Sequence, residues 1–238
     1  MMERRLAHIG TLVLDILFPP VCALCGRGGR ENIHNYLCDT CTAGIPLYET
    51  PFCAVCFARL PDQKKICHKD APLILAAASD YGSEPVRKLV WELKYSKHPA
   101  YAKVIAGLLA AYLKKSGIST TGILIVPIPL HPTRERKRGF NQAALVAEAL
   151  SARIGAPVAH ALLRVKHTPP QVEMRERDAR IENVAGAFRV SDASRITGAN
   201  IFLIDDVATT GATLREAAYA LKTANAKKIT GLVLAKAG

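Results

Sequence analysis

The chain has 238 residues, of which 50% are hydrophobic, and a formal net charge of +12. A chain of this length can bury a sizeable core, as one large domain or two small ones. No stretch approaches eighteen uninterrupted apolar residues, so a transmembrane helix is not expected. About +11 of the net charge lies after residue 70, which predicts that an anionic ligand binds there; the alternative is a solvated basic surface.

The first 22 residues superficially resemble a signal peptide, because Arg4 and Arg5 precede an apolar run. His8 and Asp15 interrupt that run, however, and no small-residue cleavage site follows it. The apolar residues recur instead at helical spacing, which favours an amphipathic helix packed on the protein. We therefore expect a cytoplasmic protein with no membrane span.

All seven cysteines lie before residue 68, and six of them form three pairs with Cys-x-x-Cys spacing. Each pair can point both sulfurs into one tetrahedral site, so two pairs complete a zinc site that has no open position for catalysis. The predicted ligands of a first, structural zinc are Cys22, Cys25, Cys38 and Cys41. The alternatives are a redox centre, for which three consecutive pairs are unusual, and a disulfide framework, against which the odd count and the missing export signal argue.

A second zinc site is incomplete in the sequence. Its predicted ligands are Cys53, Cys56 and Cys67, and the nearest candidates for a fourth are His68 and Asp70. Bound metal would supply folding energy that a small, loop-rich segment lacks. We therefore predict an N-terminal domain over residues 1–70, made of the helix and a cysteine-rich zinc ribbon, followed by a second domain over residues 71–238.

After residue 70, apolar runs alternate with amphipathic segments. The patterns predict strands at 73–81, 123–129, 201–204 and 227–237, and helices at 84–94, 98–115, 141–155 and from Thr213 onward. Strands that alternate with helices indicate a parallel sheet with helices on both faces. Gly155 is the expected C-terminal cap of its helix.

A charged segment between Leu163 and Phe188 contains no predicted strand or helix. A long polar connection within a compact domain is usually a functional loop or a lid. Its basic residues, which are Lys166, Arg175, Arg177 and Arg180, would then reach over a bound anion. The alternative is that neighbouring acids balance these residues and that all of them face water.

Residues 201–214, IFLIDDVATTGATL, combine an apolar strand, two acids and a small-residue loop that opens a helix. Backbone N–H groups at a helix N-terminus suit a phosphate, and Gly211 lets the backbone approach closely. No Gly is followed by Lys, which excludes a Walker loop, and no predicted strand is followed by G-x-G-x-x-G. Two carboxylates beside a phosphate site suit a sugar phosphate, because they accept hydrogen bonds from vicinal ribose hydroxyls. The diol or a divalent cation would relieve the repulsion between the acids.

The stretch LIDDVATTGATL resembles the phosphoribosyl pyrophosphate (PRPP) motif of type I phosphoribosyltransferases, and the whole chain is similar to the competence protein F (ComF) family of phosphoribosyltransferase-like proteins. The supporting stretches are LKYSKHP (93–99), VPIPLHPTRERKRGFNQA (126–143) and TPPQ…RIENVAGAF (168–188). The resemblance implies an α/β type I phosphoribosyltransferase fold, with a parallel sheet flanked by helices, preceded by a small zinc-ribbon domain. The sequence departs from the family's double zinc ribbon at Asp70, where a cysteine is expected.

The resemblance also implies roles for individual residues. Asp205 and Asp206 would hold the ribose, and Arg134 and Arg138 would lie near the pyrophosphate leaving group in a loop after the strand at 123–129; the alternative for this basic cluster is an ordinary turn. The residues that would bind the 5′-phosphate are Ala208, Thr209, Thr210, Gly211, Ala212 and Thr213. Residues 164–183 would form a flexible hood over the site.

The implied activity is that of a pentosyl-group transferase. An unidentified nitrogen acceptor would displace pyrophosphate from C1 of PRPP, with Mg²⁺ bound by the pyrophosphate and the ribose hydroxyls. No general base is evident. The alternative is a non-catalytic, PRPP-sensing or single-stranded DNA-binding accessory protein of DNA uptake, although no stretch interleaves aromatic and basic residues. The resemblance further implies partners among DNA-uptake proteins and a homodimer.

Overall fold

The structure, a computed structural model, describes residues 21–28, 33–34, 36–61, 67–68, 70–96, 100–166 and 184–237. The predicted N-terminal amphipathic helix lies outside these residues. So does most of the predicted hood, including the three arginines expected to reach over an anion, Arg175, Arg177 and Arg180. Among the described residues, no helix has the length and apolar character needed to cross a bilayer.

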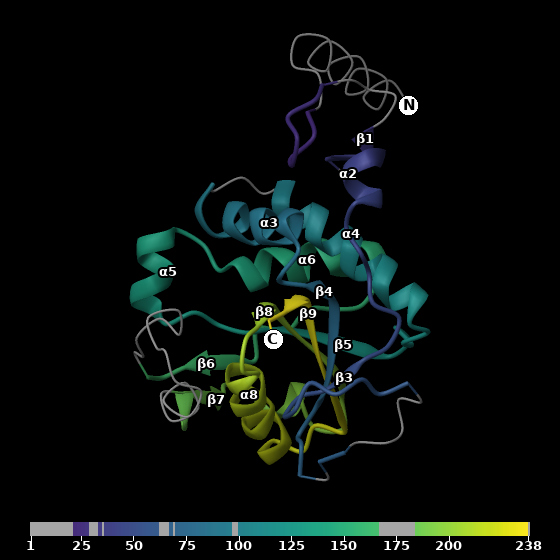
Figure 1. Cartoon of the computed structure of the whole chain (residues 1–238). Helices are drawn as coiled ribbons and strands as arrows, with labels where there is room; N and C mark the ends of the chain where they lie inside the picture. Colours follow the sequence, from purple (N-terminus) through teal and green to yellow (C-terminus); the bar gives the residue numbers. More distant parts are fainter. Residues whose placement is uncertain are drawn as a thin grey trace, which may run out of the picture.

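A five-stranded sheet with the order β3-β4-β9-β8-β5 forms the centre of the fold (Figure 1). Its four longer strands run parallel: β4 (Ile74–Asp80), β5 (Ile123–Pro127), β8 (Asn200–Ala208) and β9 (Lys228–Lys236). The short β3 (Phe52–Cys53) pairs with β4 in the antiparallel direction. The parallel strands are apolar almost throughout, as expected for strands that are covered on both faces.

Helices cover both faces of this sheet, as predicted. Figure 1 shows three of them above the sheet: α3 (Glu84–Tyr95), α4 (Ala100–Lys115) and α6 (Gln142–Ile154). Below it lie α8 (Ala212–Thr223) and the antiparallel pair β6 (Leu162–Arg164) and β7 (Phe188–Val190). Alternate residues of β8 enter the two resulting cores: Phe202 and Ile204 join the first, and Ile201 and Leu203 join the second.

Two sequence predictions were wrong in detail. The strand predicted at 201–204 continues to Ala208, because the residues beyond the apolar run still pair with β9, as in Asp205 with Val233. The basic cluster predicted as a loop is a helix, α5 (Pro132–Arg138). This helix has no buried residue and so no apolar period, but Pro132 opens it and His131 accepts a hydrogen bond from the backbone N–H of Thr133.

The other elements predicted after residue 70 are confirmed to within a few residues. Gly155 ends α6 in the left-handed conformation, with φ 70°, as its position in the sequence indicated. A short 3₁₀ turn, η2 (Ala193–Arg195), leads from β7 to β8. The charged segment begins in β6 and ends in β7. Because these two strands pair with each other, the two ends of the segment lie side by side, next to α8.

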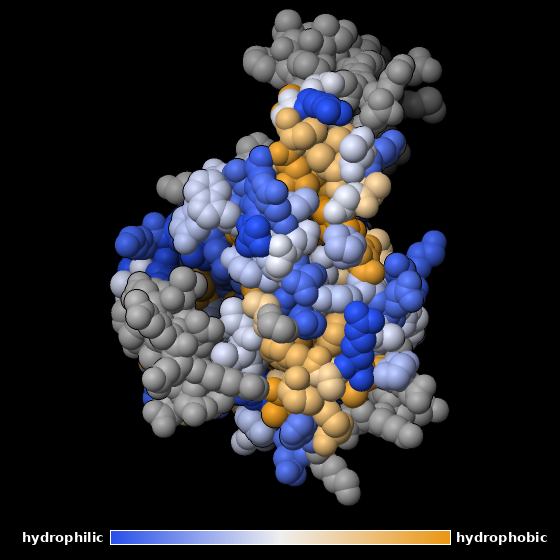
Figure 2. All heavy atoms as spheres, in the orientation of Figure 1, coloured by the Kyte–Doolittle hydropathy of each residue, from blue (hydrophilic) through white to orange (hydrophobic). Residues whose placement is uncertain are grey.

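The cysteine-rich segment has two separate attachments to the body. Its first part contains β1 (Ile33–His34), β2 (Leu37–Cys38) and α2 (Asp39–Ala43). Apolar residues of this part share one core with α3 and α4, and Figure 2 shows apolar surface continuing from the projecting head down onto the body. Its second part contributes β3 to the main sheet. The predicted domain boundary between residues 70 and 71 therefore stays a prediction.

Candidate functional site

The acid pair lies near the carboxyl end of β8, in the middle of the sheet. Successive side chains of a strand point to opposite faces, so Asp205 and Asp206 have different neighbours. The Asp206 carboxylate, which is 8% exposed, lies 2.9 Å from Nζ of Lys94 at the end of α3. The Asp205 carboxylate accepts a hydrogen bond of 2.9 Å from the backbone N–H of Asp206.

The electrostatic surroundings of the two acids also differ. Burial and the negative charge of Asp206 raise the pKa of Asp205 to about 7, against the opposing effects of Lys94 and Arg164. Burial opposes the charged form of Lys94, but the Asp206 carboxylate raises its pKa nonetheless. Asp206 thus has a fixed cationic partner, whereas Asp205 is left to interact with a donor or cation from a ligand.

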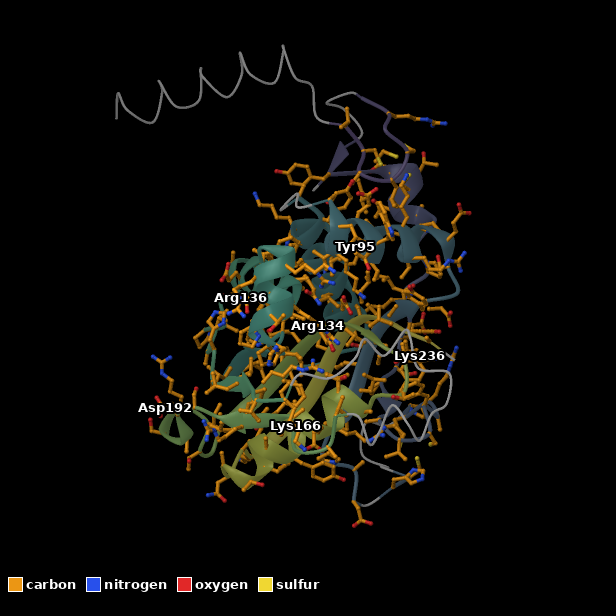
Figure 3. All side chains as sticks on the ribbon, turned by 90° about the vertical axis from the view of Figure 1, so that its left-hand side faces the viewer. Tyr95, Arg134, Arg136, Lys166, Asp192 and Lys236 are labelled. Carbon is orange, nitrogen blue, oxygen red and sulfur yellow. The ribbon has the colours of Figure 1, made fainter. Side chains whose placement is uncertain are left out.

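Arg164 on β6 interacts electrostatically with Asp205, and Arg134 on α5 interacts with Arg164. Burial, together with the positive charge of Arg134, lowers the pKa of Arg164 on β6, while the charge of Asp205 opposes this shift. The guanidinium of Arg164 also lies 5.3 Å from the ring centre of Phe188. Figure 3 shows Arg134 between Tyr95 above it and Lys166 below it. The arrangement places positive charge opposite the acid pair.

Helix α5 presents the two predicted arginines toward the body of the protein. Arg134 and Arg138 are four residues apart, so they lie on one helical face, and both are half-buried. Arg136 and Lys137 on the same helix are exposed. Arg138 donates a hydrogen bond to the side chain of Gln142, and its guanidinium lies 5.9 Å from the ring centre of Tyr95.

The six residues predicted to bind the 5′-phosphate lie directly after the acids. Ala208 ends β8, and Ala212 and Thr213 open α8. Between them, the buried Thr210 accepts a hydrogen bond of 3.3 Å from the backbone N–H of Ala212. Gly211 is the N-cap of α8, so no side chain covers the helix end from that position. A helix N-terminus of this kind can bind an anion, and phosphate binding here stays a prediction.

Gly211 has a structural role that the sequence did not indicate. Its φ of 69° is left-handed, and a Cβ added there would lie 2.9 Å from the carbonyl oxygen of Ala54. Ala54 belongs to the knuckle between Cys53 and Cys56. The backbone of the second cysteine cluster therefore packs closely against Gly211.

The first cysteine cluster has the geometry of a structural zinc site. The sulfurs of Cys22, Cys25, Cys38 and Cys41 all lie within 4.8 Å of one another. Tetrahedral zinc with bonds of about 2.3 Å separates its sulfurs by about 3.8 Å. The Sγ atoms of Cys25 and Cys38 are 3.8 Å apart. Burial raises the pKa of Cys22, but backbone hydrogen bonds outweigh it and lower that pKa to about 6, which favours the thiolate that zinc binds.

The second cluster gains a histidine as its fourth member. Ligand atoms of Cys53, Cys56, Cys67 and His68 lie within 4.8 Å of one another. Nδ1 of His68 is 3.4 Å from Sγ of Cys53 and 3.3 Å from Sγ of Cys67. In the described residues Asp70, the other candidate, is not in this group. Three thiolates and one imidazole form an established set of ligands for structural zinc.

Sequence reasoning missed Lys94 and Arg164 as members of the site. Lys94 ends a helix within the stretch that carried the resemblance, and Arg164 opens the charged segment, so both were in view. A basic residue at the end of a helix or strand is common, however. Only the folded arrangement shows that these two residues lie near the acids.

Comparison with known families agrees with this fold and these clusters. Residues 13–69 match the family described as "Double zinc ribbon domain", and residues 93–238 match the "Phosphoribosyl transferase domain". The chain is therefore a protein of the phosphoribosyltransferase fold with an N-terminal double zinc ribbon. It belongs to the ComF family.

Three relatives illustrate this membership. The chain is 31% identical over 206 residues to "DNA utilization protein YhgH" of Salmonella typhimurium, covering 84% of this chain and 83% of the relative. It is 29% identical over 231 residues to "Competence protein F" of Haemophilus influenzae, covering 91% and 96%. It is 41% identical over 100 residues to "Competence protein ComFC" of Bacillus subtilis, covering 41% and 38%.

A solved structure of the allosteric regulatory enzyme of purine biosynthesis is a more distant likeness. The match covers 61% of this chain and 30% of the chain in that structure, with a TM-score of 0.40 and 14% sequence identity.

Proposed function

We propose that the chain binds PRPP at the carboxyl end of β8 and transfers its phosphoribosyl group to a nitrogen acceptor, with release of pyrophosphate. One observation carries this proposal. The acid pair lies just before the N-terminus of α8, the basic side chains of Lys94 and Arg164 lie near it, and Arg134 in turn lies near Arg164. A sugar bearing phosphates at both ends matches this pattern of acids between two cationic regions.

Different residues of the chain would bind different parts of PRPP. Asp205 would accept hydrogen bonds from the ribose hydroxyls, and Asp206, held by Lys94, would fix the position of the strand end. The loop at 208–213 would bind the 5′-phosphate, while Arg134 and Arg138 would neutralise charge on the departing pyrophosphate. The bond between C1 and the pyrophosphate oxygen breaks, and its electron pair leaves with pyrophosphate. A bond forms from the acceptor nitrogen to C1, and the proton that this nitrogen loses passes to water or pyrophosphate.

Magnesium would enter this site with the substrate. Bound to pyrophosphate and the ribose hydroxyls, it would supply further neutralisation of the leaving group. The residues present fit a ligand that carries a cation: burial and the charge of Asp206 raise the pKa of Asp205, and a nearby cation would favour its charged form. The structural ions proposed for the two cysteine clusters are zinc.

Calorimetric titration of the zinc-loaded protein with PRPP and Mg²⁺ tests the proposal. The wild type should bind, and the double variant Asp205→Asn, Asp206→Asn should lose binding. Asp192→Asn is the matched control, because Asp192 is an exposed acid that caps η2, a task that Asn performs equally well. Figure 3 shows Asp192 at the periphery, away from Arg134. Absence of binding to the wild type, or equal binding to the double variant, would overturn the proposal.

We also propose a role in the uptake or use of DNA. The relatives named for competence and for DNA utilization support this role. Cysteine clusters arranged to hold metal suit a reducing compartment, which supports a cytoplasmic location. A screen of pyrophosphate release over candidate nitrogen acceptors would identify the acceptor.

Binding of single-stranded DNA is a second candidate function, and one observation favours it. Trp91 and Tyr95 on α3 are 58% and 60% exposed, and their ring centres are 5.4 Å apart. The guanidinium of Arg138 lies 5.9 Å from the Tyr95 ring centre, so the fold combines aromatic and basic groups that the sequence keeps apart. Aromatic side chains beside a basic surface are the usual platform for stacked bases.

Fluorescence anisotropy with a labelled oligonucleotide tests this second function. Affinity should fall steeply with salt, and Trp91→Ala should weaken it by about 1–3 kcal/mol, the usual contribution of one stacked base. Asp205→Asn should leave it unchanged. Equal affinity for Trp91→Ala and the wild type would exclude this surface as the platform.

A further inference from the structure

The loop between β8 and α8 packs directly on the second cysteine cluster. The carbonyl oxygen of Ala54 lies 2.9 Å from the position of an added Cβ at Gly211, and an edge atom of the Phe57 ring lies 3.4 Å from the same position. Ala54 is 1% exposed. Backbone of the knuckle and backbone of the loop are thus in van der Waals contact, with no room for a side chain between them.

One side chain joins the two segments. Nη1 of Arg215, in the first turn of α8, donates to the carbonyl oxygen of Ala54 and to that of Thr210, each at 2.8 Å. The first carbonyl belongs to the knuckle and the second to the loop. Since both acceptors are bound by a single charged nitrogen, a shift of either segment breaks or distorts a charge-assisted hydrogen bond.

The knuckle's shape depends on its cysteines. Sγ of Cys53 accepts a hydrogen bond of 3.4 Å from the backbone N–H of Val55, which follows Ala54 directly. Cys53 itself is anchored in β3, but the remaining three members of the cluster, Cys56, Cys67 and His68, are exposed. Packing therefore does little to hold them together, and a shared ion would do most of it.

From this geometry we propose that Arg215 is a positioning residue through which the second cysteine cluster holds the phosphate loop. Metal at Cys53, Cys56, Cys67 and His68 then strengthens PRPP binding, and PRPP strengthens retention of that metal by the same factor, because linkage is reciprocal. The proposal rests on PRPP binding at this loop, as proposed above. The first cluster packs on α3, where Lys88 donates to the carbonyl oxygen of Leu24, and serves as an internal reference.

Cysteine alkylation read by peptide mass spectrometry tests the linkage, since both clusters are measured in one sample. Zinc-loaded protein is treated with N-ethylmaleimide, with and without PRPP and Mg²⁺. PRPP should slow alkylation of Cys56 and Cys67 by about tenfold, the value of one charge-assisted hydrogen bond, and leave Cys25 and Cys41 unchanged. Equal effects on both clusters, or none on the second, would overturn the proposal.

Arg215→Met should abolish this protection and weaken PRPP binding by about tenfold. Lys222→Met is the matched control, because Lys222 also donates to two backbone carbonyls, those of Ala226 and Lys227, at the other end of the same helix. It should keep both protection and affinity. Arg215→Lys, which retains the charge but not the fork of donors, should recover part of the effect if Arg215→Met folds poorly.

Hydrogen exchange without ligand separates this proposal from the proposed function. Removal of metal should raise deuterium uptake at residues 208–214 of the wild type, whereas Arg215→Met should show high uptake in both states. If PRPP does not bind but this pattern appears, the proposed function fails, and only the part of the proposal in which the cluster positions the loop through Arg215 stands. If PRPP binds but uptake at the loop ignores the metal, the coupling fails and the proposed function stands.

Discussion

Replacement of Lys94 by Met is expected to destabilise the protein through the acid that it leaves behind. The Asp206 side chain is 8% exposed, and Lys94, 24% exposed, is its ion-pair partner at 2.9 Å. Loss of one member of a fully buried pair costs about 3–5 kcal/mol, because the other charge stays buried and uncompensated. Since Lys94 retains some contact with water, we expect a loss of about 2–3 kcal/mol at pH 7.

An exposed pair provides the matched control. Lys115 lies 3.2 Å from Glu49, but the two side chains are 46% and 72% exposed, so Lys115→Met should cost less than about 1 kcal/mol. Urea denaturation of the zinc-loaded variants measures both losses. Addition of Asp206→Asn to Lys94→Met should restore most of the stability, because the buried charge that Lys94 had balanced is then removed. Equal small losses for both lysines, or no recovery in the double variant, would refute the reasoning.

Three other predictions concern the loop, the acid and the metal. Gly211→Ala should lower stability more than Gly155→Ala, because Gly155 has a similar φ of 70° but nothing within 4 Å of its added Cβ. Both variants lose about 1–2 kcal/mol from the left-handed backbone, so equal denaturation midpoints would contradict the predicted clash at Gly211. PRPP affinity, measured by calorimetry, should rise from pH 6 to pH 8, because the pKa of Asp205 is about 7 and only its carboxylate accepts hydrogen bonds from both hydroxyls. In Asp205→Asn only the part of this rise that comes from ionisation of the PRPP phosphates should remain. An unchanged pH profile would exclude Asp205 as the group that titrates. Metal analysis should find two zinc ions per wild-type chain, one in His68→Asn and two in Asp70→Asn; two ions in both variants would exclude His68 as a ligand.

The sequence predicted most of the fold because the parallel strands are long and apolar. The apolar runs of β4 and β9 alternate with helical patterns along the chain, which indicates buried strands. By contrast, α5 has no apolar face, so only its Pro and its histidine cap mark it as a helix. The end of β8 was missed because pairing with β9, rather than its own composition, keeps it extended.

The candidate site was predictable where it is local in sequence. The acids and the following loop are contiguous, so their placement together required no tertiary information. The pairing of Asp206 with Lys94 joins residues more than a hundred positions apart, and the contact of Arg215 with Ala54 spans 161 positions. Many basic residues in a chain of net charge +12 could fill either role, so sequence alone could not select them.

The most direct test of the central claim is a crystal structure of the zinc-loaded protein with PRPP and Mg²⁺. The account predicts that the ribose hydroxyls lie within hydrogen-bond distance of Asp205, with the 5′-phosphate on residues 208–213 and the pyrophosphate facing Arg134. A PRPP molecule bound elsewhere, with no ligand beside Asp205 or on residues 208–213, would contradict it.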